Sequence, residues 1–96
     1  MKIHPRIYDY AQDLGLGVRV NGSHYVIRDL GQNRCLMLTS VEGTGCPQGL
    51  SEPARVNLWF DGMKRQGIVL AFDTARQAMR FMAHARIDFS DAMERK

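Results

Sequence analysis

The amino-acid sequence predicts a small α+β domain: an antiparallel sheet of four to five strands with an N-terminal and a C-terminal helix. Three observations predict it: an amphipathic segment near the N-terminus, a series of short alternating strands joined by tight turns, and a second amphipathic segment over residues 74–85. Sequential hairpins produce an antiparallel sheet, and terminal helices pack on its apolar face. The predicted order is α-β-β-β-loop-β-β-α.

The first predicted helix begins at Pro5, a residue that suits the opening turn of a helix. Ile7, Ala11 and Leu14 recur at helical spacing, and Gly15 is typical of a helix end. A helix of about three turns is marginal alone, so we expect it to pack on the sheet.

The clearest local pattern is a hairpin over residues 16–28, in which alternating runs flank Asn21-Gly22. Asn-Gly in this position is typical of a two-residue type I′ turn. Such a turn pairs Val20 with Ser23, Arg19 with His24, and Val18 with Tyr25. The core face would then comprise Leu16, Val18, Val20, Tyr25 and Ile27. The other face would carry Arg19, His24, Val26 and Arg28.

A third strand over residues 34–39 is apolar on both faces, which predicts a central position in the sheet. From residue 40 to residue 53 the pattern gives way to a Gly- and Pro-rich segment, which predicts a flexible loop. Residues 56–60 and 68–72 then read as a second hairpin, with the basic residues Lys64 and Arg65 at its turn.

The second helix is predicted to begin at Thr74, because Thr74 and Gln77 fit a capping box. Its apolar stripe comprises Ala75, Ala78, Met79, Met82 and Ala85. Residues 88–96 are interpreted as a tail that either frays or adds a short strand or turn. No linker or repeat divides the chain, so residues 1–96 are interpreted as a single domain.

Composition excludes some classes of protein. An apolar share of 45% and a charged share of 24% are ordinary for a globular domain, so wholesale disorder is excluded. The net charge of +3 is a mild basic bias that is compatible with nucleic acid or an acidic protein as partner. The N-terminus turns polar before any apolar run develops, and no stretch has the length of a membrane span. We therefore expect a cytoplasmic protein with reduced cysteines and no membrane partner.

No metal or cofactor site is predicted. Cys35, Cys46 and the three histidines do not stand at the short spacings that zinc sites use. The Gly-rich segment lacks the lysine of a phosphate-binding loop, and an extended segment follows it rather than a helix.

One resemblance suggests an enzyme. Residues 10–24, which end in Gly22-Ser23-His24, resemble the HicA-type toxin ribonucleases, in which a helix precedes a hairpin that carries Gly-Ser-His on its second strand. The resemblance implies RNA as substrate and His24 as the catalytic residue. His24 would lie between Arg19 and Arg28, where a histidine can act as a base toward an anionic substrate.

A second resemblance suggests DNA binding. Residues 18–39, followed by Phe72-Asp73-Thr74 and the helix to Ala85, resemble the arm-type DNA-binding domains of phage integrases. These domains place a three-stranded sheet, backed by a helix, in the major groove. The resemblance implies contacts to DNA or RNA from the basic residues of the two hairpins.

The leading hypothesis is a small non-enzymatic binding or inhibitor protein that docks on a host protein or nucleoprotein complex. Such stand-alone proteins are frequent in phages and mobile elements. Trp59 should lie on the face opposite Val56 and Leu58, and Trp and Arg dominate interface hot spots. The predicted contact residues are Trp59, Arg19, His24, Arg28, Lys64 and Arg65. An exposed apolar edge would equally allow a homodimer.

Overall fold

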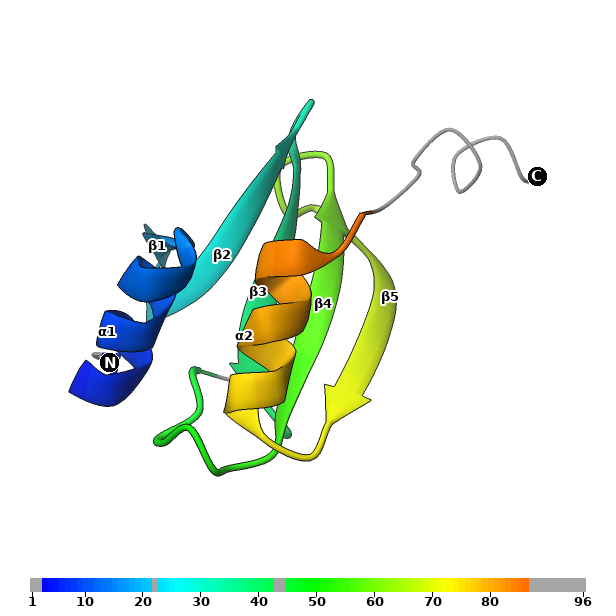
Figure 1. The fold of residues 1–96 in the computed structure, drawn as a ribbon. Helices are drawn as coiled ribbons and strands as arrows, with labels where there is room; N and C mark the ends of the chain where they lie inside the picture. The colour runs from blue at the N-terminus through cyan, green and yellow to red at the C-terminus, as the bar shows by residue number, and fades with distance from the viewer. Residues whose placement is uncertain (1–2, 22, 43–44, 87–96) are drawn as a thin grey trace.

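A computed structural model describes residues 3–21, 23–42 and 45–86 of the chain (Figure 1). Its elements are α1 (Pro5–Leu14), β1 (Gly17–Asn21), β2 (Ser23–Gly31), β3 (Arg34–Ser40), β4 (Ala54–Phe60), β5 (Arg65–Phe72) and α2 (Ala75–His84). The strands form one antiparallel five-stranded sheet in the order β1-β2-β3-β4-β5. The predicted α+β class and element order are confirmed, and β3 is central. The predicted tail, residues 88–96, lies outside the described residues.

The helix ends follow from local sequence signals. Pro5 is the first residue of α1, and the Arg6 N–H donates to His4 Nδ1 at 3.2 Å. Gly15 ends α1 in the left-handed region (φ 75°), where a residue without Cβ carries no steric penalty. At the start of α2, the Gln77 N–H donates to Thr74 Oγ1 at 3.2 Å, as the capping-box pattern predicts.

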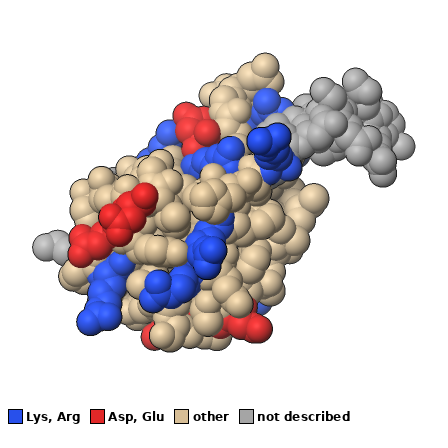
Figure 2. Space-filling model, in the orientation of Figure 1, with Lys and Arg blue, Asp and Glu red and all other residues tan. Residues whose placement is uncertain are grey.

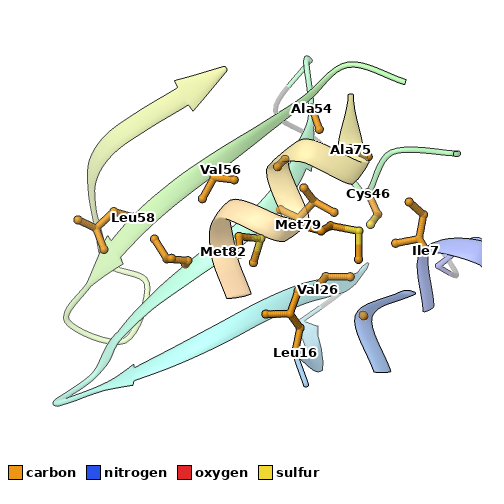
Figure 3. Close-up of a cluster of buried hydrophobic side chains, with 14 residues drawn as sticks. Ile7, Leu16, Val26, Cys46, Ala54, Val56, Leu58, Ala75, Met79 and Met82 are labelled. Atoms are coloured by element: carbon orange, nitrogen blue, oxygen red, sulfur yellow. The ribbon is translucent and has the colours of Figure 1, made fainter. Parts of the chain in front are cut away.

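Both helices pack on the same face of the sheet, and the core lies between them and the strands (Figure 3). The helices bury Ile7, Ala11, Ala75, Ala78, Met79 and Met82. The sheet contributes Val26, Leu36, Leu38, Val56 and Leu58. No helix in the described ranges is long and apolar enough to span a bilayer.

The segment between β3 and β4 contributes to this core. Cys46 and Pro47 are buried, and Figure 3 shows Cys46 near Ala75 and Met79 of α2. The Glu52 and Leu50 carbonyls accept hydrogen bonds from the Ala75 and Arg76 N–H groups, at 2.6 and 3.0 Å. Because the first N–H groups of a helix have no partner within the helix, this segment completes the start of α2.

The predicted register of the first hairpin is wrong by one residue. β1 and β2 pair Val18 with Val26, Arg19 with Tyr25, and Val20 with His24. Leu16 belongs to the core as predicted, but on β2 the core residue is Val26, while Tyr25 and Ile27 belong to the opposite face. The physical reason is tertiary: Val26 is fully buried under the helices, and this burial outweighs the local preference of Asn-Gly for a two-residue turn.

Candidate binding surface

The sheet face opposite α1 and α2 has no helix over it in the part of the chain that the structure describes. We call this surface the open face. The strand register assigns it Arg19, Tyr25, Ile27, Asp29, Cys35, Met37, Thr39, Arg55, Asn57, Trp59, Gln66, Val69 and Ala71. Ile27, Cys35, Met37, Thr39 and Asn57 are buried there, outside the core that the helices cover. The open face is therefore a second packed layer rather than a solvated sheet surface.

Two adjoining hollows indent the open face. The larger, of about 440 Å³, is lined by Tyr25, Met37, Thr39, Arg55, Asn57, Trp59, Met63, Gln66 and Val69. The smaller, of about 240 Å³, is lined by Arg19 and residues of the neighbouring hairpin turns, and Met63 lines both. Binding sites typically combine such apolar and aromatic walls with a few placed polar groups.

A hydrogen-bonded chain of side chains forms the floor of the larger hollow. The buried Asn57 donates from Nδ2 to Thr39 Oγ1 at 2.9 Å and to the Met37 carbonyl at 3.4 Å. Gln66 Nε2 donates in turn to Asn57 Oδ1 at 2.8 Å. Because buried polar groups that are paired hold one another in place, the floor has a fixed shape.

Trp59 forms one wall of this hollow. It lies opposite Cys35 on β3 and Gln66 on β5, on the face away from Val56 and Leu58, as predicted. Its Nε1 is buried and has no hydrogen-bond partner among the described residues. An unpaired buried N–H costs about 1–3 kcal/mol, a cost that the packing of the indole ring has to offset.

Met63, in the turn between β4 and β5, lines both hollows. Its backbone is left-handed (φ 72°), a region that residues with a side chain rarely adopt. The neighbouring Gly62 N–H donates to the Asn33 carbonyl at 3.0 Å, which joins this turn to the one between β2 and β3. The two turns thus support each other at one end of the open face.

Arg19, His24 and Arg28 do not form the predicted cluster on one face. Arg19 is on the open face, whereas His24 and Arg28 have the same orientation along β2 as Val26, toward the helices. Arg28 donates from one guanidinium nitrogen to the Met82 and Ala85 carbonyls, at 2.8 and 2.6 Å. The prediction of this cluster was wrong because it depended on the predicted hairpin register, which differs from the observed register by one residue.

Lys64 ends the turn between β4 and β5, Arg65 is the first residue of β5, and both are exposed. Arg65 is 5.1 Å from the ring centroid of Phe60 and forms an ion pair with Asp61 at 3.4 Å. Phe60 packs against the helix-covered core, so these contacts direct Arg65 away from the open face. Of the predicted contact residues, the open face brings together Trp59 and Arg19.

Sequence reasoning missed several residues of the open face. Arg55 and Asn57 could have been found, because they alternate with Val56 and Leu58 and so share the face of Trp59. Tyr25 could not have been assigned to this face from the sequence, because its orientation depends on the hairpin register.

The cysteines are not activated nucleophiles. Burial raises the pKa of the Cys46 thiol to about 11, and a backbone hydrogen bond at Val26 offsets this only in part. Burial also raises the pKa of the Cys35 thiol, with partial opposition from the charge of Arg19. Both thiols are therefore protonated at neutral pH. Within the described ranges, no group of three or more His, Cys, Asp or Glu side chains could hold a metal ion.

On the side that carries the helices, basic side chains are spread over the surface with acidic ones among them (Figure 2). Mixed charges of this kind are typical of a solvated surface.

Comparisons with protein families, with curated proteins and with solved structures found no match.

Proposed function

We propose that this protein is a non-enzymatic binding protein that docks on a larger protein through its open face. The observation that carries the proposal is the hollow of about 440 Å³ on this face, where Trp59, Tyr25 and Arg55 meet. Trp, Tyr and Arg dominate the binding energy of protein interfaces, and they do so where they surround a well-packed pocket.

The preformed floor of the hollow supports this proposal. Asn57 already has its hydrogen-bond partners, so a partner protein would not have to order the floor on binding. Interfaces that are organised in advance lose less conformational entropy and bind more tightly for the same area.

The charge of the open face favours a partner with an acidic surface. Arg19, Arg55 and the acidic Asp29 belong to this face, so its charge is basic on balance, and Arg19 is exposed. Arg is common at interfaces because its planar guanidinium pairs with carboxylates through two hydrogen bonds.

We further propose that the protein acts in the cytoplasm of a host cell as an inhibitor of a host protein or nucleoprotein complex, and that a phage or mobile element encodes it.

Affinity capture with matched variants tests the docking proposal. Immobilised wild-type protein, Arg55→Glu and Arg80→Glu would be exposed to the same host lysate, and captured proteins compared by quantitative mass spectrometry. Arg80 lies on the exposed side of α2, so its reversal makes the same change of charge away from the open face. We expect a partner captured by the wild type and by Arg80→Glu but lost with Arg55→Glu. Equal capture by all three would reject the open face as the docking surface.

A second candidate function, direct binding of single-stranded nucleic acid, is favoured by one specific observation. Two aromatic residues, Tyr25 and Trp59, line the same hollow as Arg55, and Arg19 lies directly opposite Tyr25. Sheets that bind single strands stack bases on aromatic side chains and pair phosphates with arginines.

Fluorescence anisotropy with labelled RNA and duplex DNA tests this second candidate. Binding through Arg19 and Arg55 should weaken log-linearly with salt, and each Arg→Ala variant should reduce the slope by about one. No binding at low salt would reject nucleic-acid recognition. The same RNA, incubated with wild-type protein and with His24→Ala, tests the ribonuclease resemblance by gel electrophoresis.

A further inference from the structure

Among the described residues that line the larger hollow of the open face, Arg55 alone carries a charge. It is half-buried, and its guanidinium forms no hydrogen bond, ion pair or ring contact with any other described residue. A guanidinium has five N–H donors and no acceptor, and its partial removal from water is unfavourable without a counter-charge. The larger hollow therefore contains a cation for which the described part of the chain supplies no anion.

The acidic residue of the open face lies in the other hollow. Asp29 lines the smaller hollow together with Arg19 and Arg34. Burial raises the pKa of the Cys35 thiol, the charge of Arg19 lowers it and that of Asp29 raises it, so both charges lie near this thiol. Opposite charges that lie close together largely cancel at a distance. Asp29 therefore acts on Arg19, and the charge of Arg55 in the larger hollow is left without compensation.

Thr39, directly opposite Arg55 in the pairing of β3 with β4, adds a neutral donor. Thr39 is 4% exposed, and its Oγ1 accepts a hydrogen bond from Asn57 Nδ2 at 2.9 Å. A hydroxyl also has one O–H to donate, and no acceptor among the described residues takes it. Directly opposite side chains of an antiparallel pair have Cβ atoms about 4.5–5.5 Å apart, so the two donors lie at the same end of the hollow.

The other end of the larger hollow is aromatic. Trp59 lies four residues beyond Arg55 on the same face of β4, which is about 13 Å at the rise of a strand. Between these two residues, the apolar Met37 and Val69 stand on either side of Asn57. A complementary occupant therefore carries an anion at the Arg55 end and apolar surface toward the Trp59 end.

We propose that the larger hollow receives an aspartate or glutamate side chain of the partner protein. Its carboxylate pairs with Arg55 and accepts the O–H of Thr39, while apolar neighbours in the partner pack on Trp59 and Val69. This inference rests on the proposed docking through the open face and adds the chemical group that is recognised there. A carboxylate suits a single guanidinium, because the two pair through parallel hydrogen bonds.

A nucleic-acid strand is less complementary to this arrangement. It carries one phosphate per nucleotide, and its affinity comes from several cations that each neutralise a phosphate. The larger hollow offers one guanidinium, and the acidic Asp29 belongs to the same face. The charges therefore favour one carboxylate over a chain of phosphates.

Peptide display with matched charge variants tests which charge is recognised. A phage library of random dodecapeptides would be selected on wild-type protein, Arg55→Glu and Arg80→Glu, and each enriched pool compared with the unselected library. Circular dichroism would confirm that the variants are folded. We expect enrichment of Asp and Glu by the wild type and by Arg80→Glu, and enrichment of Lys and Arg in their place by Arg55→Glu.

Exchange of one acid for its amide tests the carboxylate itself. The strongest wild-type binder would be synthesised with its acidic residue and with the isosteric amide, Glu→Gln or Asp→Asn, and both forms titrated by calorimetry. We expect the amide form to bind the wild type about tenfold to a hundredfold more weakly, because the charge-assisted pair is lost. Arg55→Gln should bind both forms equally, since the coupling requires both partners.

The outcomes separate this inference from the docking proposal. The inference would be overturned if the wild type enriched no acidic residues, or if the amide form bound it as tightly as the acid. If such peptides still shifted the fluorine resonance of fluorotryptophan at Trp59, the open face would remain a docking surface and only the carboxylate would be wrong. Peptide binding that left this resonance unchanged would count against both proposals. Arg55-dependent binding of an oligouridine without any acidic enrichment would overturn the inference in favour of phosphate.

Discussion

Arg28 on β2 donates a hydrogen bond to the main-chain carbonyl of Met82, in the last turn of α2, at 2.8 Å. The same guanidinium nitrogen reaches the Ala85 carbonyl at 2.6 Å. A cation in this place pairs with carbonyls that have no partner within the helix and with the negative end of the helix dipole. The contact therefore joins the first hairpin to α2, and it requires the face of β2 that carries Val26 to lie toward the helices.

Replacing Arg28 should destabilise the fold. We expect Arg28→Met, which keeps much of the apolar stem, to lower the free energy of unfolding by about 2 kcal/mol, because charged hydrogen bonds are lost. Arg28→Lys should retain only part of this free energy of unfolding, since an ammonium does not reproduce the planar guanidinium. Urea unfolding followed by circular dichroism measures the difference. The exposed Arg19→Met is the control, with an expected change within about 0.5 kcal/mol, and equal losses at the two positions would contradict this assignment.

Two variants of Trp59 distinguish the contribution of its unpaired N–H to stability from that of its ring contacts. Trp59→Phe removes Nε1 and retains an aromatic ring, so we expect the free energy of unfolding to change by less than about 1 kcal/mol. Trp59→Ala removes the ring contacts and should cost about 2 kcal/mol or more. Thermal or urea unfolding of the two variants checks this. If Trp59→Phe proved as costly as Trp59→Ala, the part of the indole that phenylalanine lacks would carry the stabilisation, which would contradict this account.

Cys46 should make stability depend on alkaline pH. Burial raises the pKa of its thiol to about 11, so the unfolded chain loses this proton at lower pH than the folded protein. The protonated thiol's contribution is fully present below about pH 9 and is lost as pH rises toward about 11, by about 1.4 kcal/mol per unit. Cys46→Ala should therefore lose less stability than the wild type between about pH 8 and 10.5 in urea unfolding. Parallel losses in the two proteins would show that Cys46 does not contribute.

Met63 should store backbone strain. Its left-handed backbone favours glycine, so we expect Met63→Gly to be about 1 kcal/mol more stable than Met63→Ala. The comparison with alanine cancels the loss of the long side chain, which both variants share. Chemical unfolding of the pair measures the difference, and equal stability would argue against strain at this turn.

What the sequence predicts well here is set by neighbouring residues. Pro5, Gly15 and Thr74 mark helix ends through contacts within a few positions, and the alternation over residues 54–60 places Trp59 on the correct face. The predicted face of Tyr25 was wrong because the hairpin register depends on long-range packing. Val26 is buried under helices distant in sequence, and Arg28 donates a hydrogen bond to α2. The hollow could not be predicted from the sequence for the same reason, since it combines residues of β2, β3, β4 and β5 with Met63 from a turn.

Fluorine NMR of the single tryptophan tests most directly whether the open face binds the partner. Protein labelled with fluorotryptophan should give one resonance, from Trp59 in the wall of the hollow. Once affinity capture has identified a partner, we predict that adding it shifts or broadens this resonance in the wild type and in Arg80→Glu. Arg55→Glu should show no such change at the same concentrations. A partner that binds with the Trp59 resonance unchanged would contradict the open face as the binding surface.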